Sequence, residues 1–447
     1  MTKTPIPYGR QHITPEDIQA VVDVLQSDFL TQGPRIAEFE TAFAGYIGSK
    51  YAVAVANGTA ALHLCTMALN VKPGDKVITT PITFAASANC VRYAEGEVVF
   101  ADIDPETYLL DIKEVEKLLK AAPKGTYTGI IPVDFAGRAV DLEVFRKLAD
   151  EYGCWVIEDA CHAPGGYFID SKDQKQNCGN GNFADLAIFS FHPVKHIACG
   201  EGGMITTNDE ELYKKLLLLR THGITREQEV FKNTVEFASG SEQSTLNSEP
   251  FTDYPGWYME MQELGYNYRL TDFQAALGLS QLKRADEGLQ KRKKIATRYD
   301  EAFAGMFKSH PANDPMTNNA RSANDPMAKG QNAARSANDP MTAEGQNDPR
   351  SANDPMTNNN PGHAYHLYII ETEKRKELYD HLRKNNIFAQ VHYIPVHLMP
   401  YYRQFGWKEG DLPHAEKYYS RCLSLPMFPT LTEEEQAFVI KTISDFF

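Results

Sequence analysis

The chain of 447 residues lacks any uninterrupted apolar run of about 18 residues, the length that a membrane-spanning helix needs. Basic residues are fewer than acidic ones: the chain has 45 Lys and Arg and 59 Asp and Glu, which gives a formal net charge of −14. A chain this acidic lacks a general basic surface for a nucleic-acid backbone. The first ten residues also lack a basic segment followed by an apolar one. We therefore expect no membrane or nucleic-acid partner, and a cytoplasmic location.

Cysteine is scarce, and no two cysteines are spaced as a CxxC pair. The seven residues are scattered and odd in number: Cys65, Cys90, Cys154, Cys161, Cys178, Cys199 and Cys422. This usage argues against a disulfide framework and against a zinc site. We expect reduced thiols and no bound metal.

Apolar segments alternate with amphipathic ones through the first half of the chain, which with 42% hydrophobic residues can bury a full core. We predict strands at 51–56, 76–80, 98–102, 129–133, 155–158, 185–189 and 203–207, and helices at 14–27, 60–69, 85–93 and 142–152. This alternation is typical of an α/β fold with a mostly parallel sheet covered on both faces. Ligands of such folds bind at the carboxyl ends of the strands.

The second half is predicted to be helical from 270 to 307, where the basic run 291–294 has the pattern of a solvated helix face. Ala-Asn-Asp-Pro-Met then recurs from Ala312, Ala323, Ala337 and Ala352, and residues 312–360 contain no Leu, Ile, Val, Phe, Tyr or Trp. Such a segment cannot bury enough apolar surface to offset its ordering entropy, so 310–362 is predicted to be a disordered insertion. Beyond it we predict strands at 366–370 and 388–392 and helices at 373–385, 415–421 and 433–446.

A lysine follows one of the predicted strands and carries the first chemical signal. The strand 185–189 leads into Ser190, a short polar loop then presents Lys195, and glycines cluster at 200–203. An amine at the mouth of a sheet can form an imine with an aldehyde cofactor if it is kept partly neutral. A merely solvated loop lysine is the alternative.

Three further strand ends carry residues that suit a pyridoxal phosphate (PLP) cofactor. The strand 155–158 ends at Asp159, whose carboxylate suits a pyridine nitrogen, and His162 could hydrogen-bond the ring hydroxyl. Thr59 and Ala60 open a helix after an Asn-Gly turn, a geometry that binds phosphate. Phe84 could stack on the flat ring. Taken singly, each has a structural alternative: a capping carboxylate, a structural histidine, an N-cap by Thr59, or a core aromatic.

Together these motifs resemble the fold-type I PLP enzymes, and within them the DegT/DnrJ/EryC1/StrS sugar aminotransferases, above all members that act in pseudaminic acid biosynthesis. The segments that carry the resemblance are 8–11, 30–33, 189–195, 263–270, 275–282 and 389–393. It implies a large PLP-binding domain at 36–280, a smaller α+β domain at 281–447, and an N-terminal arm with a substrate loop at 1–35. It also implies transfer of an amino group from L-glutamate to C4 of a UDP-linked 4-keto-6-deoxy-N-acetylhexosamine.

The resemblance assigns roles residue by residue. Lys195 would bind the cofactor covalently and move protons, Asp159 would pair with the ring nitrogen, and His162 stands where many relatives have Gln. Cofactor contacts would come from Thr59, Ala60, Phe84, Ser190 and, across a homodimer with shared active sites, Asn267. The nucleotide sugar would contact Ala60, Ser190, Asn267, Tyr8, the loop Asp28, Phe29, Leu30 and Thr31, and the run Gln390, Val391, His392 and Tyr393.

The sequence departs from the family in two places. Residues 196–199 read His-Ile-Ala-Cys where relatives often carry hydroxyl side chains, and the repeat insertion has no counterpart. Four alternatives stay open: another nucleotide keto sugar (dTDP-linked or gluco-configured, aminated at C4 or C3), a sugar dehydratase, a PLP-binding regulatory protein without turnover, and an α/β domain for another phosphate ligand. Against the dehydratase, such relatives replace the cofactor lysine with His, whereas Lys195 is present.

Overall fold

The computed structural model describes residues 4–239, 253–307 and 362–447. The predicted insertion at 310–362 therefore lies outside the described residues, apart from Gly362. Within the described ranges, no helix combines the length and the apolar character needed to cross a bilayer.

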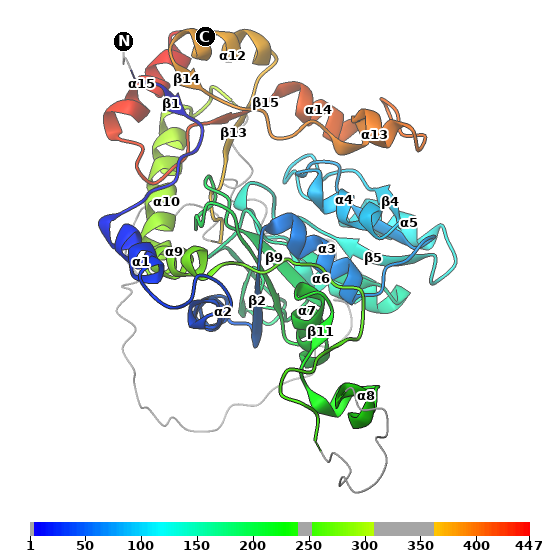
Figure 1. Ribbon diagram of the computed structural model, residues 1–447. Helices are drawn as coiled ribbons and strands as arrows, with labels where there is room; N and C mark the ends of the chain where they lie inside the picture. The colour runs from blue at the N-terminus through cyan, green and yellow to red at the C-terminus, as the bar shows by residue number, and fades with distance from the viewer. Residues whose placement is uncertain (1–3, 240–252, 308–361) are drawn as a thin grey trace, which may run out of the picture.

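A seven-stranded sheet lies at the centre of the molecule (Figure 1). In spatial order its strands are β2 (Tyr51–Val55), β10 (Gly203–Thr207), β9 (Leu186–Ser190), β6 (Trp155–Asp159), β5 (Tyr127–Ile131), β3 (Lys76–Thr79) and β4 (Glu97–Phe100). Strand β10 is antiparallel to both of its neighbours, and the other pairs are parallel. All seven strands predicted for this region are confirmed.

Both faces of the sheet are buried, as the continuous apolar strands predict. Along β2, Val53 and Val55 belong to one core cluster and Ala52 and Ala54 to another, because successive side chains point to opposite faces. Helices α3 and α7 supply residues to the first cluster, and α2 and α9 to the second. The strand ends are therefore the part of the sheet that remains for a ligand.

Several helices of the larger part, but not α2, α4 or α6, begin at a residue whose side chain caps the helix. Thr14 and Thr271 each form a capping box, at the starts of α1 and α9. The bounds are α1 (Pro15–Leu25), α2 (Pro34–Ile47), α3 (Gly58–Ala68), α4 (Ala86–Tyr93), α5 (Ile112–Lys120), α6 (Leu142–Tyr152), α7 (Glu210–Arg220), α8 (Val235–Ser239) and α9 (Asp272–Leu282). Two short hairpins, β7 (Tyr167–Ile169) with β8 (Lys175–Asn177) and β11 (Ile224–Thr225) with β12 (Glu260–Met261), complete this part.

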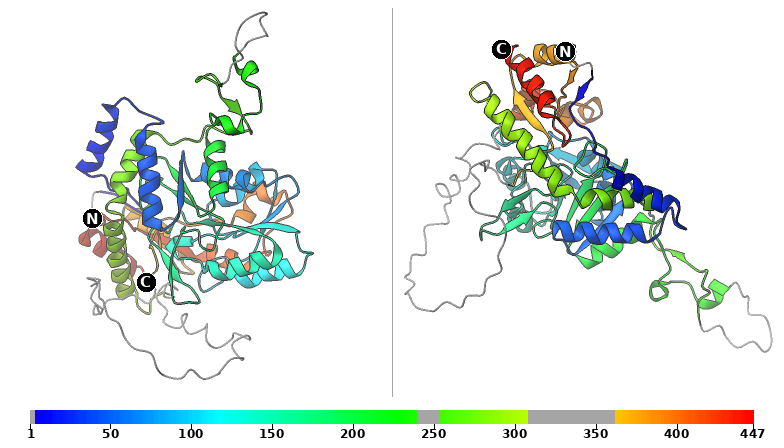
Figure 2. Two further views of the ribbon diagram at one scale, coloured as in Figure 1. Left: turned by 90° about the horizontal axis from the view of Figure 1, so that it is seen from below. Right: turned by 90° about the vertical axis from the view of Figure 1, so that its left-hand side faces the viewer.

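Helix α10 (Ala285–Ala302) leads from the large part into a smaller α+β lobe, seen at the top of Figure 1 and from the side in Figure 2. The lobe contains β13 (Tyr368–Glu371), β15 (Cys422–Leu425), α12 (Arg375–Lys384) and α15 (Glu433–Ser444). The helices α13 (Pro400–Arg403) and α14 (Pro413–Arg421) of the same part of the chain pack against the core of the large sheet. The predicted strand 388–392 is shorter than expected: β14 (Ile387–Phe388) pairs with β1 (Ile6–Pro7) of the N-terminal arm. The domain limits at 35 and 280 stay predictions.

The prediction of a solvated basic face on α10 is wrong at Arg292, whose side chain is 1% exposed. Its guanidinium donates to the carbonyls of Tyr365, His366 and Met427 at 3.0–3.3 Å. Burial lowers the pKa of Arg292 to about 10. The side chain therefore braces two segments of the small lobe against α10 instead of facing solvent.

Candidate active site

Three strand ends meet at one edge of the sheet. Gly203 pairs with Val55 on one side and with Ser190 on the other, so the turn after β2 lies beside the end of β9. A Cβ added at Gly58 would lie 3.1 Å from the Cβ of Ser190. The close approach of backbone and hydroxyl leaves a small polar cradle at the start of α3, the location predicted for phosphate.

The N-cap of the helix at this cradle is not the residue that the sequence suggested. Asn57, not Thr59, is the N-cap of α3, and its Oδ1 accepts from the N–H of Ala60 at 2.8 Å. The N–H groups of Gly58 and Thr59 have no acceptor among the described residues. Those two groups, with the hydroxyl of Ser190, are free to bind an anion, whereas the N–H of Ala60 is already used.

Asp159 is the last residue of β6 and is 6% exposed. Its Oδ2 accepts from the hydroxyl of Ser87 at 2.6 Å, and its Oδ1 accepts from the N–H of Cys161 at 3.2 Å. Ser87 was not found from the sequence. It lies in the first turn of α4, and its hydroxyl is also 2.8 Å from that of Thr83. Both carboxylate oxygens are therefore oriented by neutral donors.

Lys195 lies in a turn after β9, where its N–H donates to the carbonyl of His192 at 2.8 Å. Burial lowers the pKa of its amine, and the charge of Arg292 acts in the same direction, while Asp159 and Cys161 oppose it. Asp159 pairs with Ile188 of β9, the strand that leads to Lys195, so the two residues lie at the same edge of the sheet. A lowered pKa favours the neutral amine, the form that reacts with an aldehyde.

The ring of Phe84 is 64% exposed, so the core-aromatic alternative is excluded. It lies just before α4, and its centroid is 6.4 Å from that of Tyr393, which comes from the small-lobe side. An exposed aromatic beside a buried carboxylate offers a stacking surface for a flat ring.

His162 is 4% exposed, and burial lowers its pKa well below the ordinary value, so its imidazole is neutral. Its Nδ1 accepts from the N–H of Ala136 at 3.2 Å, which places the proton on Nε2. Nε2 is 3.3 Å from the hydroxyl oxygen of Tyr393 and therefore donates to it. This link between the two lobes was not found from the sequence, because the two residues lie 231 positions apart.

The N-terminal arm joins this group of side chains. The ring of Tyr8 lies 5.1 Å from that of His392, and a Cβ at Gly9 would be 3.4 Å from Val194, the residue before Lys195. Gln390 is exposed and pairs through its backbone with Ser424, and Val391 is half-buried against the core.

A family model for the DegT/DnrJ/EryC1/StrS aminotransferase family matches residues 11–348 and 328–444. The chain belongs to this family. Among relatives, the spore coat polysaccharide biosynthesis protein SpsC of Bacillus subtilis is 34% identical, over 98% of this chain and 96% of that protein. The UDP-4-amino-4,6-dideoxy-N-acetyl-beta-L-altrosamine transaminase of Campylobacter jejuni (strain 81-176) is 32% identical over the same shares.

Solved structures agree with the family. PseC of Helicobacter pylori, an aminotransferase of pseudoaminic acid biosynthesis, is similar to this chain with 28% identity, a TM-score of 0.73 and 99% coverage of both chains. The putative sugar aminotransferase Spr1654 of Streptococcus pneumoniae, in its PMP form, is similar with 27% identity, a TM-score of 0.75 and 98% coverage of both. These likenesses establish the PLP fold-type I architecture for this aminotransferase, with a large sheet domain and a smaller α+β lobe.

The same comparisons imply dependence on pyridoxal phosphate, since Spr1654 is known in PLP and PMP forms. The residues of this family member fit that cofactor on three structural grounds. The cradle at Gly58 and Ser190 has N–H groups without an acceptor in the described parts of the chain, Phe84 exposes its ring, and Asp159 has two oriented oxygens. A phosphate, a flat ring and a protonated ring nitrogen are the three features these groups would bind.

Two predicted parts of the site are not brought to Lys195 within the described chain. Residues 28–31 are exposed and rest on the start of α9, through the N–H of Asp272 to the carbonyl of Leu30 and a bridge between Thr31 and Thr271. Asn267 is exposed on the segment that pairs with Thr221. Their roles at the active site stay predictions.

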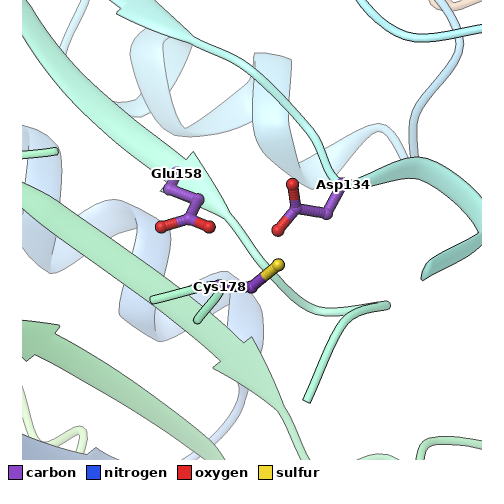
Figure 3. Close-up of side chains that lie close together, drawn as sticks. All are labelled: Asp134, Glu158 and Cys178. Carbon is purple, nitrogen blue, oxygen red and sulfur yellow. The ribbon is translucent and has the colours of Figure 1, made fainter. Parts of the chain in front are cut away.

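One group of residues in the described chain has the spacing of metal ligands: Asp134, Glu158 and Cys178 (Figure 3). It lies behind Asp159, and sequence reasoning did not single it out. All seven cysteines of the aminotransferase are free thiols.

The buried histidines of the site predict loss of stability in acid. Burial lowers the pKa of His392 to about 4, and its Nδ1 is 2.9 Å from the hydroxyl of Ser424. A depressed histidine pKa contributes stability above the unfolded value, and this contribution is lost as the pH falls toward the folded value. With a pKa of about 4 in the folded state and about 6.5 in the unfolded state, protonation of His392 alone should lower the free energy of unfolding by about 2 kcal/mol between about pH 7.5 and pH 5.

Urea denaturation of the cofactor-free protein at both pH values measures this loss. His392→Asn should reduce the pH dependence by about that amount, while His414→Asn, at an exposed position, should leave it unchanged. Equal pH dependence in wild type and His392→Asn would contradict the assignment.

Proposed function

We propose that this protein transfers an amino group from L-glutamate to C4 of a UDP-linked 4-keto-6-deoxy-N-acetylhexosamine, as a UDP-4-amino-4,6-dideoxy-N-acetyl-β-L-altrosamine transaminase of pseudaminic acid biosynthesis. The observation that carries the transaminase part is the convergence of Lys195, Asp159 and the Ser190 cradle at one sheet edge. The named activities of the Campylobacter and Helicobacter relatives support the choice of sugar.

Bound pyridoxal phosphate supplies an aldehyde and an electron-withdrawing ring, which carry the amino group between the two substrates. Lys195 would hold the cofactor and, with its amine neutral, take a proton from the α-carbon of glutamate and return one at C4 of the sugar. Asp159 would keep the proton on the ring nitrogen. Thr59, Ser190 and the turn at Gly58 would hold the phosphate.

The sugar would enter between the two lobes. Tyr8, His392 and Tyr393 lie together there, and the hydroxyl of Tyr393 accepts from His162 and keeps its own proton for a further acceptor. A sugar hydroxyl or the C4 oxygen would suit this donor. Closure of the lobes over the substrate would exclude water from the transferred amine.

We also propose a cytoplasmic homodimer with shared active sites. Exposed apolar side chains support it: Phe29, Leu30, Trp257, Met261 and Leu264 are 50–73% exposed. Trp257, Met261 and Leu264 lie on or next to β12, whose hairpin projects from the body (Figures 1 and 2). Asn267 follows this segment and would reach the site of the second subunit.

The experiment is a two-stage assay on the cofactor-loaded enzyme. L-glutamate alone should change the visible absorption of the cofactor and release one 2-oxoglutarate per site. A panel of keto sugars is then tested: altro- and gluco-configured UDP-4-keto sugars, dTDP-4-keto sugars and a 3-keto sugar. We expect kcat/KM to be at least about tenfold higher for the altro-configured UDP sugar. Absence of the first stage would favour a regulatory protein, and preference for another sugar would replace the substrate.

A further inference from the structure

Two carboxyl groups and a thiol meet in the interior directly behind Asp159. Asp134, Glu158 and Cys178 are each no more than 1% exposed, and one oxygen or sulfur atom of each lies within 4.8 Å of those of the others. Figure 3 shows the carboxyl groups of Asp134 and Glu158 facing each other, with the sulfur of Cys178 pointing toward Asp134. None of the three has a part in the proposed function.

Backbone N–H groups donate to one oxygen of each carboxyl group. Asp134 Oδ1 accepts from the N–H of Val140, and Glu158 Oε2 accepts from the N–H of Gly179, both at 2.8 Å. Asp134 Oδ2 is buried and, in the described chain, accepts no hydrogen bond from a donor such as a backbone N–H. Among the described ion pairs, none joins a lysine or arginine to either carboxylate.

Two carboxylates cannot both be ionised in such a place, because each buried charge would be uncompensated and would repel the other. Burial raises the pKa of both groups, and the facing Asp134 raises that of Glu158 further. Burial also raises the pKa of the Cys178 thiol, which therefore keeps its proton. A proton held by Glu158 would give Asp134 Oδ2 the donor that it lacks.

The group is joined to the end of β6 by the backbone. The N–H of Asp134 donates to the carbonyl of Asp159 at 3.0 Å, and the N–H of Asp159 donates to the carbonyl of Pro132 at 2.9 Å. Glu158 immediately precedes Asp159, so their side chains point to opposite faces of the sheet. One face of this strand end therefore holds the carboxylate toward Ser87, while the other is tied to Asp134 and Gly179.

We propose that Asp134 and Glu158 share a single proton, with the Cys178 thiol as a second donor to Asp134, and that this buried pair positions the Asp159 carboxylate. Glu158 and Asp134 are positioning residues: neither touches the cofactor. The role toward Asp159 rests on the proposed function, whereas the shared proton does not.

Infrared difference spectroscopy tests the proton directly. Wild type minus Glu158→Gln, at neutral pH, should contain the C=O stretch of a protonated carboxylic acid, shifted in D₂O. Wild type minus Asp134→Asn should contain the same band, because the asparagine amide would donate to an ionised Glu158. The control Glu143→Gln replaces another buried glutamate, on α6, and should give no such band. A band that survives in either cluster variant would overturn the sharing.

Metal content separates a proton from a cation in the same place. We expect no stoichiometric divalent metal in the purified holoenzyme after EDTA treatment. One equivalent of metal that is retained by wild type and lost in Glu158→Gln would overturn the proposal.

Cofactor binding tests the positioning. Glu158→Gln keeps a donor toward Asp134, so its affinity for pyridoxal phosphate and its visible spectrum should stay close to wild type. Glu158→Ala leaves Asp134 without that donor and should weaken cofactor affinity by about tenfold, with a shifted pH midpoint of the absorption band. Glu143→Ala should do neither. Equal cofactor affinity of Glu158→Ala and Glu158→Gln would overturn the positioning role. If the wild-type protein did not bind pyridoxal phosphate, the proposed function would fail, but the infrared test of the shared proton would still hold.

Discussion

Lys195→Ala is expected to lower transaminase turnover by about 10⁴-fold or more, because it would remove both the proposed covalent attachment point of the cofactor and the proposed proton-transferring amine. Turnover is measured as release of 2-oxoglutarate from L-glutamate in the presence of the keto sugar. Borohydride reduction of the wild-type holoenzyme, followed by peptide mass spectrometry, should place the retained cofactor on Lys195.

The matched control is Lys214→Ala, an exposed lysine on α7 paired with Glu210. It should keep wild-type turnover. A small amine added to Lys195→Ala should restore part of the activity, since the missing group is a proton acceptor at a defined place. Full turnover in Lys195→Ala, or cofactor recovered on another lysine, would contradict the assignment.

The same variant tests whether sites are shared between subunits. If Asn267 serves the partner's site, a hybrid of Lys195→Ala and Asn267→Ala subunits contains one intact site. A random mixture of two inactive variants should then regain about a quarter of wild-type activity. No recovery would place Asn267 outside the partner's site.

Asp159→Asn is expected to reduce kcat by about 10²–10³-fold, because a neutral amide cannot stabilise a positive charge on the ring nitrogen. The protein should still fold, since the amide can keep one of the two hydrogen bonds, to Ser87 or to Cys161. Stopped-flow absorption of the glutamate half-reaction measures the loss separately from sugar binding.

Asp170→Asn provides the control for Asp159→Asn, because Asp170 is a buried aspartate that accepts from Lys172 and Gln174 in a turn away from the site. It should leave kcat unchanged, even if stability falls. Near-normal kcat in Asp159→Asn would show that another group protonates the ring nitrogen, and the location of the cofactor would have to be revised.

The parts of the site that follow a single strand could be predicted from the sequence. Asp159 and Ser190 end apolar strands, and Lys195 follows the second of them in a loop, so their place at the sheet edge depends only on local pattern and parallel order. The fold class and the seven central strands follow from the same alternation.

Contacts between distant segments could not be predicted in that way. Ser87 looks like an ordinary residue of a helix start, and its bond to Asp159 depends on how α4 packs against β6. The basic run around Arg292 predicted an exposed side chain. The prediction was wrong because the carbonyls that accept hydrogen bonds from its guanidinium come from distant segments of the small lobe. The sequence suggested Thr59 as the N-cap of α3, but the helix begins two residues earlier, with Asn57 as the N-cap.

The N-terminal arm contacts three separate parts of the molecule within a few residues. Its β1 strand pairs with β14, the carbonyl of Tyr8 accepts from the N–H of Met427, and Gly9 lies against the loop of Lys195. A hinge movement of the small lobe would therefore pull this arm along the lysine loop. Any change in the angle between the lobes would thus be transmitted to the loop that carries Lys195, through an arm segment only a few residues long.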